Sequence, residues 1–81
     1  MKAWITRYAL TEGIREVEGE IDERTPSMFV IPRHTGGFEC AHGADWHRTR
    51  EAAIAQAERM RQAKIASLEK QLARVRGLKF E

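Results

Sequence analysis

Residues 49–77 restrict the fold of this 81-residue chain more than any other feature, because they reach a terminal glycine without an internal glycine or proline. Alanine and other strong helix formers fill the segment. Thr49 is a typical N-cap residue, and Glu51 follows in the first turn, where the helix dipole favours an anion. Arg76 and Gly77 are typical of a helix C-terminus. The sequence therefore predicts one long C-terminal α-helix over about 49–77.

Several segments before this helix have patterns typical of β-strands. They are rich in β-branched and aromatic residues or alternate in polarity, and turns containing glycine or proline separate them. The predicted strands cover residues 2–10, 14–21, 28–31 and 38–42, and residues 11–13 form a hairpin loop in which Gly13 takes a positive φ. The third of them is apolar on both faces, which favours a central place in the sheet. The sequence thus predicts an α+β fold, in which a three- to four-stranded antiparallel β-meander over about 2–42 precedes the helix.

We expect a single domain of residues 1–81, with the β-meander in 1–47 and the helix and a short tail in 48–81. A chain of this length buries only about 60–65% of its unfolded surface, so its core is marginal without a supplement. A disulfide within the chain is excluded, because Cys40 is the only cysteine. The additional stability would then have to come from a bound metal or from a partner subunit.

The cysteine usage and the hydropathy predict a cytoplasmic protein. A lone thiol without a signal peptide is typical of a reducing compartment. The longest purely apolar run, residues 28–31, is far shorter than the roughly 20 residues that a membrane span needs. We therefore expect no membrane partner.

The apolar side chains of the helix lie within an arc of about 140° when plotted at 100° per residue. As a helix, residues 49–77 would span roughly 43 Å. The predicted strands would make a sheet only about 15–20 Å wide. We expect the first half of the helix to pack on this sheet, with Trp4, Tyr8 and Trp46 in the core between them, and the second half to extend past it.

Beyond the sheet, the apolar positions follow the 3-4-3 spacing of a short coiled coil. These positions, called the seam below, are Ile65, Leu68, Leu72 and Val75. Exposed apolar patches of this kind usually mark an interface. The sequence therefore predicts a homodimer that pairs through the seam, and the alternative is a monomer in which the helix crosses its own sheet diagonally.

The cluster of His34, Cys40, His42 and His47 has metal-ligand chemistry, since thiolate and imidazole bind tetrahedral zinc. Its spacing lacks the paired C-x-x-C or H-x-x-x-H pattern of a zinc site. We expect Cys40 to act as a small buried hydrophobic residue beside Phe38. A nucleophilic Cys–His pair would need a third group to orient the base, and none is evident. The sequence predicts no metal, no cofactor and no enzymatic activity.

The net charge of +2 conceals an asymmetry. Residues 1–47 hold five Lys or Arg against eight Asp or Glu, a net of −3, whereas residues 48–81 hold nine against four, a net of +5. This division would steer an acidic partner to the helix or let two copies attract head to tail. The candidate partner-binding residues are Glu16, Glu18 and Glu20 on an exposed strand face, and Arg61 and Lys64, which interrupt the apolar stripe of the helix.

Residues 2–14, KAWITRYALTEGI, and residues 46–72, from WHRTREA through LEKQL, together resemble small uncharacterised proteins of phages and prophages. The likeness covers most of the chain. Small phage proteins of this size often act as stoichiometric inhibitors or adaptors of host machinery, anti-CRISPR proteins among them. The resemblance implies this class and a place in the host cytoplasm, and it transfers no binding residue.

A non-enzymatic protein-binding module, derived from a phage and acting on an unidentified host protein, is the function that we expect. A nucleic-acid-binding regulator that uses the basic helix of a dimer is the first alternative, although the basic residues surround the helix and form no stripe. A small-molecule sponge with a pocket between subunits is the second alternative.

Overall fold

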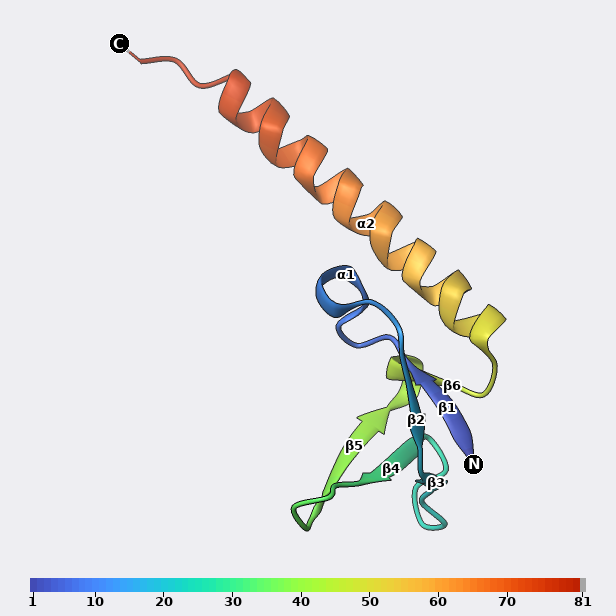
Figure 1. Cartoon of the computed structure of the whole chain (residues 1–81). Coiled ribbons are helices and arrows are strands. Elements are labelled where there is room, and N and C mark those ends of the chain that lie inside the picture. The colour runs from blue at the N-terminus through green and yellow to red at the C-terminus, as the bar shows by residue number, and fades with distance from the viewer. Residues whose placement is uncertain (81) are drawn as a thin grey trace.

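The computed structural model describes residues 1–80, in which antiparallel strands precede one long helix, so the predicted α+β fold is confirmed (Figure 1). Within these residues, six strands form two sheets of three strands each. In chain order the elements are β1 (Lys2–Ile5), α1 (Ala9–Glu12), β2 (Arg15–Glu18), β3 (Glu20–Ile21), β4 (Met28–Pro32), β5 (Phe38–His42), the 3₁₀ turn η1 (Gly43–Asp45), β6 (Trp46–His47) and α2 (Arg50–Arg76).

Two sheets take the place of the single β-meander expected from the sequence. β1 lies between β2 and β6 in the first sheet, and β4 lies between β3 and β5 in the second, as its apolar pattern predicted. The predicted strand 14–21 is divided between them, because β2 pairs with β1 and β3 pairs with β4. Gly19 lies at this division. A Cβ atom there would overlap the carbonyl oxygen of Val30 and lie 2.7 Å from Cε2 of Phe29, so the close approach of the two sheets requires glycine.

The first strand is shorter than predicted. β1 ends at Ile5, because the backbone N–H of Thr6 donates to the carbonyl of Asp45 in η1, at 2.9 Å, and the chain turns away from β2. Good helix formers then build α1 where the sequence predicted a strand end and a hairpin loop. Gly13 takes the predicted positive φ, 80°, but it ends α1 and closes no hairpin.

The core lies between the two sheets. Its buried apolar members come from β1, β4, β5 and β6, and they are Ala3, Ile5, Phe29, Ala41 and Trp46. The rings of Phe29 and Trp46 stack with their centroids 5.1 Å apart. The expected aromatic core between sheet and helix is therefore wrong: Trp46 is buried between the sheets, Trp4 is half-buried and Tyr8 is exposed. The helix contributes only Ala53 to the buried apolar residues, so each sheet covers the other.

The boundaries of α2 agree with the prediction. The side chain of Thr49 caps its N-terminus, accepting a hydrogen bond from the N–H of Ala52 at 3.1 Å. Gly77 follows its last residue, and the N–H of Gly77 donates to the carbonyl of Ala73 at 3.1 Å. Both caps satisfy backbone groups that a helix end leaves without an intrahelical partner.

The second part of α2 projects from the rest of the fold (Figure 1). The strands β1 and β6 and the short helix α1 contact α2, whereas residues 61–80 are all exposed. The molecule measures 59 × 27 × 22 Å, and its radius of gyration is 17.4 Å. A compact chain of this length would have a radius of about 12 Å. The prediction that the helix extends past the sheet is confirmed, and the sheet covers even less of it than expected.

Candidate functional site

The seam lies on the projecting part of α2. The side chains of Ile65, Leu68, Leu72 and Val75 are 42%, 49%, 49% and 62% exposed. The neighbouring turns of α2 shield the rest of each side chain from solvent, since residues three and four apart cover one another on a helix. The structure therefore brings all of the predicted seam residues to one side of one helix and provides no surface of the same chain to cover them.

The seam is not a continuation of the side of α2 that packs on the fold. The residues of the first turns that are buried or half-buried are Ala53, Gln56, Ala57 and Met60. At 100° per residue, the centre of that group and the centre of the seam differ by roughly 90° around the helix axis. The centre of the seam is therefore turned away from the sheet-facing side of α2.

Basic side chains surround the seam. Residues 61–80 contain one acidic residue, Glu69, and six basic ones, a net of +5, and the basic ones are Arg61, Lys64, Lys70, Arg74, Arg76 and Lys79. Arg61 lies 3.1 Å from the carboxylate of Glu58, one turn before it. Exposed pairs of this kind contribute little to stability. No helix within the described residues is long and apolar enough to cross a membrane.

The three acidic candidates lie on two sheets. Glu16 and Glu18 belong to β2, whereas Glu20 belongs to β3, so they do not form one row along one strand. All three are exposed. The ammonium group of Lys2 lies 3.2 Å from Glu16, and the amino group of Met1 lies 3.5 Å from Glu18. Two of the three carboxylates predicted to contact a partner are therefore paired with positive groups of the same chain.

The acidic and basic candidates form separate surfaces. Arg61 and Lys64 lie on α2, whereas β3 lies at the opposite end of the fold (Figure 1). A single partner would have to be large to contact both. We therefore treat the seam and its basic surroundings as the candidate docking surface.

The four residues with metal-ligand chemistry do not come together in one group within the described residues. In residues 1–80, no three His, Cys, Asp or Glu side chains form a group that could hold a metal ion. Nε2 of His47 lies 3.1 Å from Oγ1 of Thr6, and His34 and His42 are exposed. Cys40 is half-buried, and Phe38 does not cover it as expected, since Phe38 is 64% exposed.

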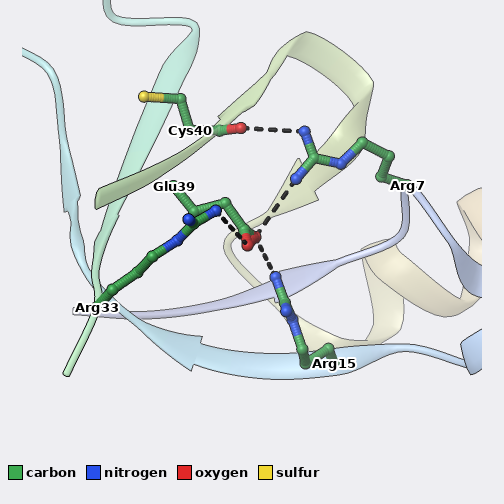
Figure 2. A network of polar contacts seen from close by, with 5 residues as sticks. All are labelled: Arg7, Arg15, Arg33, Glu39 and Cys40. Atoms are coloured by element: carbon green, nitrogen blue, oxygen red, sulfur yellow. Dashed lines mark hydrogen bonds and ion pairs between the residues drawn. The ribbon is translucent and has the colours of Figure 1, made fainter. Parts of the chain in front are cut away.

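A cluster of arginines around Glu39 was not predicted. Figure 2 shows three arginine side chains reaching the Glu39 carboxylate from different directions. Nη2 of Arg7 lies 3.3 Å from Oε1, Arg15 donates to the same oxygen, and Nη2 of Arg33 lies 3.9 Å from Oε2. Nη1 of Arg7 also donates to the carbonyl of Cys40 at 3.1 Å. The cluster links the end of β1 and the start of β2 to β5, and so it joins the two sheets.

Comparison with protein-family models, with curated proteins and with solved structures finds no significant match to this chain.

Proposed function

We propose that this chain is a protein-binding module that docks through the seam and the basic side chains around it on α2. One observation carries this proposal: every residue from 61 to 80 is exposed, although this segment holds the seam. Completing the burial of half-exposed large apolar side chains stabilises a complex by about 1 kcal/mol each. A helix that projects with such side chains is suited to a helix-in-groove or helix-pairing contact.

The partner that fits this surface is an amphipathic helix with acidic flanks. Its apolar side chains would cover the seam, and its carboxylates would face the net charge of +5 on residues 61–80. Complementary charge beside an apolar seam sets partner choice in coiled coils. The seam spans about two heptads, which is short for a coiled coil, so the flanking charges contribute an important share of the affinity.

A second copy of the chain is the competing occupant. The homodimer predicted from Ile65, Leu68, Leu72 and Val75 stays a prediction, and the 3-4-3 spacing favours it. Antiparallel pairing would, however, bring two segments of net +5 side by side. Because salt screens repulsion between exposed charges, a homodimer of this kind would strengthen as salt is added, whereas a complex with an acidic partner would weaken.

We further propose that the partner is a host protein and that the module acts in the host cytoplasm by occupying a surface of that protein. The resemblance to small phage and prophage proteins supports this part of the proposal. An inhibitor or adaptor that acts stoichiometrically needs a docking surface and no catalytic group.

Titration with model peptides tests the proposed docking. The acidic probe is a helical peptide of about three heptads with Leu at a and d and Glu at e and g, and the matched control carries Lys at e and g. We expect calorimetry at low salt to detect binding of the acidic probe alone, and this binding to weaken at about 0.3 M salt. Binding of a short DNA duplex in place of the acidic peptide would favour the nucleic-acid alternative. Sedimentation of the chain without peptide, at both salt concentrations, tests the homodimer.

A further inference from the structure

The arginine cluster holds more positive charge than its carboxylate neutralises. Arg7, Arg15 and Arg33 converge on Glu39, whose side chain is 20% exposed. No second carboxylate in residues 1–80 lies within 4.0 Å of these three guanidinium groups. Three cations around one anion leave a net local charge of +2.

Hydrogen-bond donors in the cluster are also incompletely used. Nε of Arg7 is buried and has no hydrogen-bond partner within the described residues. The approach of Arg33 to Glu39, at 3.9 Å, is beyond hydrogen-bond distance. A guanidinium group carries five N–H donors and no acceptor, so Arg15 and Arg33, whose side chains are 51% and 57% exposed, keep donors that a ligand can reach.

An open hollow of about 530 Å³ adjoins the cluster. Its lining combines Arg15, Arg33 and the Glu39 carboxylate with the apolar side chains of Val17, Ile31 and Pro32. Its size is within the range of small-ligand sites. The backbone N–H of Arg33 donates to the carbonyl of Gly37 at 3.1 Å, which closes the turn after β4 and fixes the position of Arg33 beside the hollow.

We propose that this hollow binds a phosphate group, either as the free ion or as the monoester of a small molecule. Guanidinium groups recognise phosphate through paired N–H donors, and the apolar wall would contact the organic part of a monoester. The arginines converge on one point and do not follow a line at the spacing of nucleic-acid phosphates. The site lies on the strands, so it is independent of the docking surface on α2.

Nuclear magnetic resonance of the whole chain in a phosphate-free buffer tests this site. The probes are inorganic phosphate, AMP and adenosine, and the observed signals are the backbone amides of the hollow and the Nε–H groups of Arg15 and Arg33, which line it. We expect phosphate and AMP to shift these signals and adenosine to leave them unchanged. Tighter binding of AMP than of phosphate would identify a monoester site, and equal binding would identify a site for the free ion.

Arg33→Gln is the decisive variant, because Arg33 makes the longest contact in the cluster and its loss leaves Glu39 paired with Arg7 and Arg15. We expect the affinity for phosphate and AMP to fall at least tenfold. Arg24→Gln, which removes the same charge from an exposed residue that does not line this hollow, should bind as the unmutated chain does. The proposal is overturned if neither anion binds at about ten millimolar, if adenosine binds as well as AMP, or if Arg33→Gln and Arg24→Gln bind equally.

Discussion

Replacing Leu68 and Leu72 with glutamate is expected to abolish binding of the acidic model peptide while the fold stays intact. Both side chains are 49% exposed and lie at the centre of the seam. The double substitution removes about 2 kcal/mol of apolar contact, which corresponds to a loss of roughly 30-fold in affinity, and repulsion against the acidic flanks increases this loss. The unfolding temperature should change little, because exposed substitutions usually cost less than about 0.5 kcal/mol and glutamate is a good helix former.

The matched control is the pair Ala66→Glu and Ala73→Glu. These exposed residues lie on α2 roughly opposite the seam, and the pair changes the net charge by the same amount. We expect this variant to keep most of the affinity and to lose only what the lower positive charge costs. Equal loss in the two double variants would mean that charge alone attracts the peptide and that the seam is not the contact.

Gly19→Ala is expected to destabilise the domain much more than Gly77→Ala does. The added methyl group would overlap the carbonyl oxygen of Val30 and the ring of Phe29, where the chain passes from the first sheet to the second. A backbone carbonyl cannot move without breaking the pairing of β3 with β4, in which Glu20 is opposite Val30. Overpacking of this kind costs about 3 kcal/mol, a large fraction of the stability of a small domain.

Gly77→Ala provides the comparison for this effect. Gly77 has a φ of −82°. The nearest atom to an added Cβ would lie 3.4 Å away, an ordinary contact. Alanine at such a site leaves stability unchanged or raises it by up to about 1 kcal/mol. Urea unfolding of both variants measures the difference, and a Gly19→Ala protein as stable as Gly77→Ala would show that the two sheets do not approach as described.

Local signals in the sequence were sufficient for α2. Thr49 and Gly77 each act on the few residues beside them, so the helix boundaries could be predicted to within one residue. The seam could be predicted for the same reason, because the spacing of its side chains is a property of the helix alone. The exposure of the seam could be predicted because the helix is much longer than the sheet is wide.

The arrangement of the strands depends on contacts that are distant in the sequence. The alternation of polar and apolar residues over 14–21 predicts one strand. The chain changes sheets at Gly19 because Phe29 packs against its backbone, a contact that the sequence pattern does not reveal. β6 could not be recognised, since its two residues pair with β1 from the other end of the β-region. The apolar stripe of the helix predicts that the helix covers the sheet. The sequence therefore places the aromatic residues at the wrong interface.

The arginine cluster could not be predicted either. Arg7, Arg15, Arg33 and Glu39 come from separate elements and share no spacing pattern. Each of them alone reads as a solvated surface charge. They meet because the two sheets face one another, so the cluster follows from the same long-range packing that the sequence pattern did not reveal.

Hydrogen exchange of α2, with and without the acidic model peptide, tests the central claim most directly. In the free chain, we expect amides beyond residue 61 to exchange much faster than those of the first turns, since a helical segment of this length without tertiary contacts is marginal. Adding the acidic peptide should protect the turns that carry the seam, and the Lys-flanked peptide should leave them unprotected. Protection already present in the free chain, or no response to the acidic peptide, would contradict an unpartnered docking surface on α2.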